Sequence, residues 1–161
     1  MCKKIIILIT ISLTFFSCKK NVEIENNEKY SWDYIIISNT SEEIKVYKEY
    51  DTASFSRPIY KLVEGNEIGG KYELINTERE TLNFTEAEKD SIASYVLNII
   101  NNPVEKNEFC TDYVGKLNVK IGNWTSSFSA NYKSVCKIDT ISKTTLKLHK
   151  LLNTKIKFND Y

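Results

Sequence analysis

The sequence predicts an α+β domain in which an antiparallel sheet carries two helices on one face. Three observations support this prediction. Runs rich in β-branched and aromatic residues fill the first half of the domain, a helical apolar periodicity follows Thr85, and a long hairpin pattern surrounds Gly122-Asn123. Strands, a helix, a hairpin and a second helix in this order are typical of a sheet covered on one side.

The first half of the domain is expected to form short strands. Residues 30–37 are strand-like in composition, and Asn39-Thr40-Ser41 supplies a turn before a second strand at residues 44–47. Further short strands are expected at residues 59–63, 71–75 and 81–84, with a break at Gly69-Gly70 between the first two.

Two helices are expected. Thr85 and Glu88 form a capping box, and the helix should end at Asn101-Asn102-Pro103. Its expected apolar face consists of Ile92, Tyr95, Val96, Ile99 and Ile100. A second helix is expected at residues 142–152, burying Leu148, Leu151 and Leu152, before a last strand at residues 155–158.

A long hairpin is expected between the two helices. A two-residue loop at Gly122-Asn123 predicts four cross-strand pairs on one face: Ile121 with Trp124, Val119 with Ser126, Leu117 with Phe128, and Tyr113 with Tyr132. A one-residue slip would bury serines against Leu117 and Val119, so the register is expected to be well specified.

The N-terminus reads as an export signal. Lys3 and Lys4 precede an apolar run at residues 5–16, which is too short for a spanning helix of roughly 20 residues. Ser17-Cys18 then resembles the signal of bacterial lipoproteins of the Bacteroidota type, although Phe15 replaces the usual Leu. The resemblance implies a signal peptide at residues 1–17, an acylated Cys18 with a polar tether at residues 18–29, and one globular domain at residues 30–161.

The resemblance also implies that the protein is located in the cell envelope. Lys19 stands where an Asp would signal retention in the inner membrane, which favours the outer membrane. The segment from Lys19 to Glu23 is not the acidic cluster of surface-exposed lipoproteins, so a periplasm-facing domain is expected. The lipid chains (palmitate among them) would hold the protein to the membrane, because several acyl chains together anchor firmly.

Two cysteines remain if Cys2 is removed with the signal peptide and Cys18 is acylated. In an oxidising compartment, Cys110 and Cys136 most simply form one disulfide. The predicted register places Cys110 opposite Val135, and a bulge or a loosened hairpin base would bring the two sulfurs together. The hairpin in the C-terminal half is therefore expected to be braced by this bridge.

The composition argues against several chemistries. Removing residues 1–17 leaves 20 basic and 21 acidic residues, a balance with no electrostatic footprint for nucleic acid. The single histidine, His149, lies in an expected helix, and a structural zinc site needs four N or S ligands. Acidic pairs such as Glu42-Glu43 and the Glu78-Arg79-Glu80 run fall in expected loops. We therefore expect no enzyme activity, no cofactor and no metal.

Two further features are candidate sites. Tyr30, Trp32 and Tyr34 alternate along one strand, and an exposed stripe of this kind could stack on sugar rings, whereas a buried stripe would pack against the helices. Asp51-Thr52-Ala53 resembles the O-glycosylation motif of exported Bacteroidota-type proteins, which makes Thr52, in an expected loop, the candidate acceptor.

The sequence does not identify a molecular function. The leading hypothesis is a membrane-anchored envelope lipoprotein whose domain binds another protein, in the manner of an inhibitor or immunity factor. The alternative is a lipoprotein that binds a glycan or small ligand through the Tyr30, Trp32 and Tyr34 stripe. Burial of the stripe distinguishes the two hypotheses.

Overall fold

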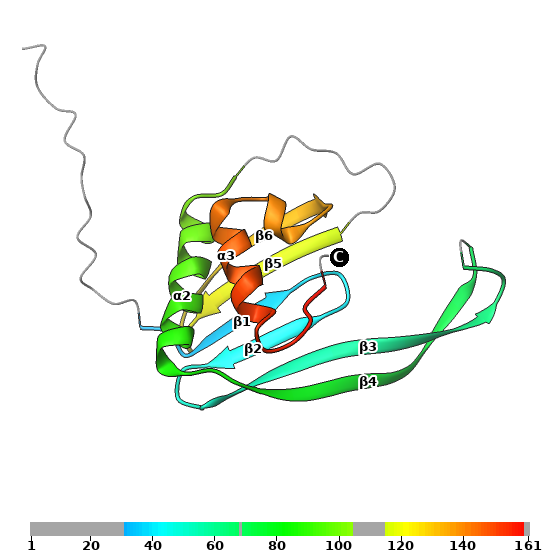
Figure 1. Ribbon diagram of the computed structural model, residues 1–161, viewed down its shortest axis with the longest axis horizontal. Helices are drawn as coiled ribbons and strands as arrows, with labels where there is room; N and C mark the ends of the chain where they lie inside the picture. The colour runs from blue at the N-terminus through cyan, green and yellow to red at the C-terminus, as the bar shows by residue number, and fades with distance from the viewer. Residues whose placement is uncertain (1–30, 68, 105–114, 160–161) are drawn as a thin grey trace, which may run out of the picture. The chain divides into compact units, whose positions relative to one another are not determined.

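The computed structural model describes residues 31–67, 69–104 and 115–159. Within these ranges, a six-stranded open sheet carries two α-helices on one face (Figure 1), which confirms the expected α+β class. In chain order the elements are β1 (Tyr34–Ser38), β2 (Glu43–Tyr47), β3 (Thr52–Glu64), β4 (Lys71–Asn83), α2 (Glu86–Asn101), β5 (Gly115–Gly122), β6 (Ser127–Val135), the 3-10 helix η2 (Ile138–Thr140) and α3 (Lys143–Leu152).

The strands follow the spatial order β4-β3-β2-β1-β5-β6, and every neighbouring pair is antiparallel. Successive hairpins join β1 to β4. The chain then returns through α2, and β5 pairs with the edge of β1 that β2 leaves free. As a result, the β3–β4 and β5–β6 hairpins lie at opposite edges of the sheet (Figure 1).

The helix-covered face of the sheet forms the hydrophobic core. Its buried cross-strand neighbours are Ile35, Ile37, Ile44, Val46, Ala53, Phe55, Leu117, Val119 and Ile121. From β6, Tyr132 donates its hydroxyl to the carbonyl of Ile99 in α2, at 3.4 Å. Since side chains alternate along a strand, the intervening residues lie on a second face that carries no helix among the described residues (Figure 1).

The first helix begins where the capping box predicts. The backbone N–H of Thr85 donates to Glu88 Oε2 at 2.8 Å, and the Glu88 N–H donates back to Thr85 Oγ1 at 3.3 Å. The helix ends at Asn101, with Asn102 as its cap. Its buried apolar residues are Ile92, Ala93, Val96 and Ile99, whereas Tyr95 and Ile100 are only half-buried.

α2 also buries a lysine that the apolar periodicity does not predict. Lys89 is 2% exposed, and its ammonium donates to the carbonyls of Lys48 at 2.9 Å and Tyr50 at 3.2 Å. It also pairs with the exposed carboxylate of Glu86. Because both carbonyls belong to the segment between β2 and β3, Lys89 fixes that segment to the helix.

The second helix also matches its prediction. Ser142 caps α3, with its hydroxyl accepting from the Thr145 N–H at 3.0 Å. Leu148 and Leu152 are buried, whereas Leu151 is half-buried. The expected strand at residues 155–158 is wrong. Residues 153–155 form a turn, and the tail after it bonds to side chains rather than to a sheet.

The β5–β6 hairpin exists, but its predicted register is wrong. Ile121 pairs with Phe128, Val119 with Ala130, and Leu117 with Tyr132, so the partner strand is shifted by four residues. Asn123 explains the longer turn, because its Oδ1 accepts from the backbone N–H groups of Thr125 at 3.0 Å and Ser126 at 2.9 Å. An even shift preserves the faces, so Leu117, Val119 and Ile121 are buried as expected.

A bulge interrupts the base of this hairpin. Lys116 pairs with Lys133, but Gly115 pairs with Val135, which leaves Ser134 as an extra residue on β6. Ser134 adopts a positive φ of 57°, the left-handed conformation that such insertions use. Cys136 follows directly after β6 and is half-buried, whereas Cys110 lies outside the described residues. The predicted disulfide therefore stays a prediction.

Candidate functional site

The β3–β4 hairpin extends far beyond the rest of the sheet. Each strand has 13 residues, but β2 pairs only with residues 53–56 of β3. The remaining residues, 57–64 and 71–78, form a two-stranded ribbon with no third strand in the described structure (Figure 1). We call this ribbon the arm. The three short strands expected in this region are therefore parts of two long ones.

Two irregularities set the register of the arm. Ile59 pairs with Asn76 and Tyr60 with Leu74, so Ile75 is an extra residue on β4. Beyond it, Leu62 pairs with Tyr72, and the second irregularity lies between this pair and the pair of Glu64 with Lys71. Residues Tyr60, Leu62, Tyr72 and Leu74 therefore share one face of the arm, and Lys61 and Glu73 pair on the other. We call these four apolar residues the arm patch.

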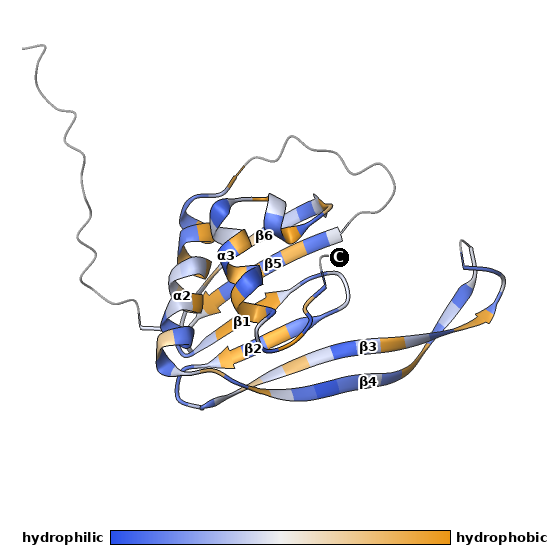
Figure 2. Cartoon of the chain, viewed as in Figure 1, coloured by the Kyte–Doolittle hydropathy of each residue, from blue (hydrophilic) through white to orange (hydrophobic). Residues whose placement is uncertain are grey.

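The arm patch is exposed to an unusual degree. Tyr60 is 56% exposed, Tyr72 47% and Leu74 57%. Figure 2 shows hydrophobic bands on both strands of the arm, outside the core. By strand alternation the patch continues the side of β3 that carries Ser54 and Ser56, opposite the buried Ala53 and Phe55. A contiguous apolar surface of this kind marks an interaction site in soluble proteins.

Contacts at the tip hold the patch in place. Leu62 lies over Gly70, where an added Cβ would come within 2.1 Å of the leucine Cδ1. Gly65 turns the chain with a φ of 87°, a conformation that favours glycine. The Tyr72 hydroxyl donates to the carbonyl of Glu67 at 3.1 Å. These contacts connect the apolar side chains of the patch to the described residues of the tip.

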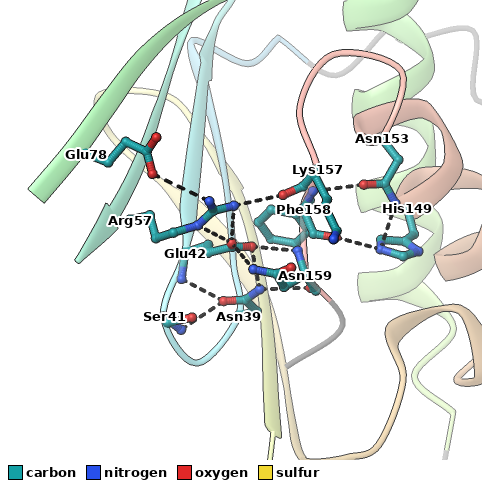
Figure 3. A network of polar contacts seen from close by, with 10 residues as sticks. All are labelled: Asn39, Ser41, Glu42, Arg57, Glu78, His149, Asn153, Lys157, Phe158 and Asn159. Carbon is teal, nitrogen blue, oxygen red and sulfur yellow. Dashed lines mark hydrogen bonds and ion pairs between the residues drawn. The ribbon is translucent and has the colours of Figure 1, made fainter. Parts of the chain in front are cut away.

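The base of the arm is held by an ion pair between a half-buried arginine and a buried carboxylate. Arg57 is the first arm residue of β3, and its Nε donates to Glu42 Oε1 at 2.6 Å (Figure 3). The same guanidinium donates to the carbonyl of Lys157 at 2.9 Å and pairs with Glu78 at 3.5 Å. It also lies 5.0 Å from the Phe55 ring centroid. Arg57 therefore fixes the arm to the β1–β2 turn and to the C-terminal tail.

Glu42 is the centre of this network (Figure 3). Its side chain is fully buried, and Oε1 accepts from Arg57 and from the side chain of Asn159. Oε2 accepts from the Asn39 side chain at 3.0 Å and from the Asn159 backbone N–H at 2.7 Å. Since donors of the protein itself occupy both oxygens, this carboxylate has a structural role.

His149 contacts the same tail. Its Nε2 lies 3.0 Å from the carbonyl of Phe158 and 2.9 Å from Asn153 Nδ2, and the Phe158 N–H donates to Asn153 Oδ1 at 2.8 Å (Figure 3). These contacts hold the tail against α3. The described residues contain no group of three or more His, Cys, Asp or Glu side chains that could hold a metal ion.

The predicted aromatic stripe is not an exposed surface in the described part of the chain. Trp32 is 2% exposed, and Tyr34 is half-buried beneath Lys120, whose ammonium lies 5.5 Å from the ring centroid. Tyr30 lies outside the described residues. A buried Trp32 cannot stack on a ligand, which removes the main support for a glycan-binding face.

Three other predicted sites have different outcomes. Cys18 lies outside the described residues, and so does Cys110 of the predicted bridge. Thr52 is exposed, but it is the first residue of β3 rather than a loop residue. Among the helices described, none is long and apolar enough to cross a bilayer.

Sequence reasoning missed the arm patch. A signal for it exists, because Tyr60-Lys61-Leu62 and Tyr72-Glu73-Leu74 both alternate apolar and charged residues. Antiparallel pairing of these two triplets sets each tyrosine opposite a leucine. Of the acidic residues expected in loops, Glu42 does lie in the turn between β1 and β2 but is buried, whereas Glu78 lies in β4.

Comparison of the chain with protein-family models, with curated proteins and with solved structures found no match.

Proposed function

We propose that this chain is the protein-binding module of a membrane-anchored envelope lipoprotein and that it contacts its partner through the arm. The observation that carries the proposal is the arm patch, with Tyr60, Tyr72 and Leu74 each about half exposed on a two-stranded ribbon. Tyrosine is enriched at the energetic centres of protein interfaces, because it offers a large contact area and a polar tip. An inhibitor or immunity-like role fits a domain of this kind.

The energetics of the arm favour an external partner. A two-stranded ribbon is marginally stable in water without a third strand or a packed layer. Burying apolar surface contributes about 25 cal/mol per Å², so a partner that covers the patch stabilises both the ribbon and the complex. The fixed base at Arg57 and Glu42 reduces the conformational entropy lost on binding.

The edges of the arm offer a second mode of contact. Within the described residues, β4 pairs only with β3, so the backbone groups along its outer edge face no other strand. A partner strand could add there by β-augmentation. The run of Glu78, Arg79 and Glu80 along β4 opposes indiscriminate edge pairing, because charged side chains discourage aggregation through exposed edges.

The cellular context of the proposal follows from the N-terminal sequence. Acylation at Cys18 would anchor the domain to the outer membrane on its periplasmic side, with residues 19–29 as the tether. The same compartment would oxidise Cys110 and Cys136 to a disulfide that braces the base of the β5–β6 hairpin. No enzyme activity and no cofactor belong to this proposal.

A pull-down from native membranes tests the proposal. The bait is the tagged full chain, compared with a Tyr60→Ser/Leu74→Ser double variant and with Lys61→Ser as the matched control on the opposite arm face. The proposal predicts a protein that the wild type and Lys61→Ser both retain at similar levels and that the double variant loses by at least about tenfold. Recovery of only abundant membrane proteins, equally with all three baits, would contradict it.

A further inference from the structure

The β5–β6 hairpin carries an unbalanced positive charge. Residues 115–135 contain three lysines and no acidic residue. Lys116 and Lys133 lie directly opposite each other on the sheet face away from the helices, and Lys120 lies on the same face. Like charges in such a pair destabilise a sheet, and in the described structure neither Lys116 nor Lys133 forms an ion pair. This face therefore attracts an anionic partner.

The turn of the same hairpin exposes a tryptophan. Trp124 is 92% exposed, whereas the other tryptophan, Trp32, is buried. The turn is ordered, because Asn123 Oδ1 accepts from the backbone N–H groups of Thr125 and Ser126, and the Asn123 N–H donates to the Ser126 carbonyl at 2.9 Å. Tryptophan beside lysine is the combination that anchors proteins at the headgroup region of a bilayer.

The first described residues of the domain lie beside this turn. The Trp124 N–H donates to Asp33 Oδ2 at 3.1 Å, and the Asp33 N–H donates to the Gly122 carbonyl at 2.8 Å. The Asn123 side chain lies 3.4 Å from the carbonyl of Ser31, the first described residue. The chain that would lead from an acylated Cys18 therefore arrives at the same end of the sheet as Trp124.

We propose that Trp124 and the lysines on the uncovered face of the β5–β6 hairpin contact an anionic lipid surface. The inference rests on the anchor in the proposed function, which brings this end of the domain to the membrane. The lysines supply attraction to lipid phosphates, and Trp124 inserts at the headgroup level. Asp33 is the acidic residue in contact with the turn, and its carboxylate accepts from the Trp124 backbone.

The topology places the arm at the end of the sheet away from Trp124. Tyr34 pairs with both Gly122 and Tyr47, so the start of β1 and the end of β2 lie at the Trp124 end of the sheet. β3 runs antiparallel to β2, from that end outwards. The residues of β3 beyond Ser56 span roughly 25 Å at a strand rise of 3.3 Å each. The arm therefore begins at the end of the sheet away from Trp124, and its patch shares the sheet face of Lys120.

Quenching of tryptophan fluorescence by brominated lipid tests the contact. The full acylated chain is reconstituted into vesicles of phosphatidylcholine containing about one third phosphatidylglycerol, and into pure phosphatidylcholine. The wild type is compared with Trp124→Phe, which retains only Trp32. The contact predicts quenching at least about twofold stronger in the wild type than in Trp124→Phe, and stronger in the anionic vesicles.

The lysines have a matched control on α3. Lys116→Gln/Lys120→Gln/Lys133→Gln should reduce the quenching, whereas the same charge change at the exposed Lys143, Lys147 and Lys150 should not. Equal quenching of wild type and Trp124→Phe, or equal effects of the two triple variants, would overturn the contact. If the chain incorporates labelled palmitate but Trp124 is not quenched, the lipid contact is refuted and the anchor is retained. If Trp124 is quenched in a chain that incorporates no label, the anchor is refuted and the lipid contact is retained. Neither outcome depends on the arm.

Discussion

Glu42, in the turn after β1, accepts hydrogen bonds from both the backbone and the side chain of Asn159, 117 residues later in the chain. Asn39 completes the connection, because its side chain donates to Glu42 and to the Asn159 carbonyl at 2.9 Å. The C-terminal tail is therefore tied to the first hairpin and, through Arg57, to the base of the arm. A substitution at this point should affect stability at several elements together.

Glu42→Gln should destabilise the fold by about 2–4 kcal/mol, since it leaves Arg57 without its buried carboxylate and sets an amide N–H₂ against donors. Urea unfolding measures the loss. Glu43→Gln is the matched control, because the Glu43 side chain is 37% exposed and pairs with the similarly exposed Lys45 at 2.9 Å. It should cost less than about 1 kcal/mol. Equal small losses in the two variants would show that the network contributes little.

Lys89→Met should lower stability by about 1–2 kcal/mol, because the apolar stem is retained but the carbonyls of Lys48 and Tyr50 lose their buried donor. Amide hydrogen exchange should accelerate in the segment between β2 and β3. Lys147→Met, on the exposed side of α3, is the control and should change neither quantity. Unchanged hydrogen exchange in Lys89→Met would show that Lys89 does not fix this segment to α2.

The pKa of Glu88 lies below its usual value, chiefly because the carboxylate accepts a hydrogen bond from Lys155 and also from the Thr85 backbone. A lowered folded-state pKa adds stability that is present above the ordinary glutamate pKa of about 4.3 and is lost as the pH falls through the lower folded value. Glu88→Gln should therefore flatten the loss of stability between about pH 5 and pH 3. Urea unfolding across this range measures it.

Lys155→Met provides the check on that assignment. Removing the main cause should raise the pKa of Glu88 towards its usual value, which an NMR titration of the Glu88 carboxyl carbon would report. A titration that does not move in Lys155→Met would assign the lowered pKa to the helix cap alone.

Peptide mass spectrometry without reductant tests the disulfide. A cross-linked peptide containing Cys110 and Cys136 is expected from protein isolated from the envelope, and its reduction should lower the unfolding midpoint. The gain from a closure of this length is about 3 kcal/mol, and less where a hairpin already restrains the ends. Two free thiols in the exported protein would exclude the bridge.

The helices could be predicted from the sequence because their signals are local. Thr85 with Glu88, and Ser142 at the next helix start, specify the first turn through contacts three residues apart. The sheet class could also be predicted, since alternation marks Leu117, Val119 and Ile121 as one buried face. A period of two cannot distinguish registers that differ by four residues, so the β5–β6 pairing needed the turn chemistry of Asn123.

The tail and the arm depend on distant contacts. Residues 155–158 look like a strand, but Asn153 and Glu42 satisfy the backbone of the tail with side chains. The arm patch forms because an extra residue on β4 makes Tyr60 and Leu74 cross-strand neighbours. No local sequence pattern predicts this bulge. The candidate site was therefore the part of the molecule that the sequence predicted least well, while Trp32 of the aromatic stripe, the alternative site, is buried.

Site-specific photo-cross-linking in living cells tests the central claim most directly. A photoreactive residue replaces Tyr60 or Leu74 in the arm patch, or Lys61 on the opposite face, so the three probes lie on two adjacent residue pairs of one ribbon. The account predicts a discrete protein adduct from position 74, also obtained from position 60 and at least about fivefold weaker from position 61. An absence of adducts from positions 60 and 74, or adducts of equal yield from all three, would contradict it.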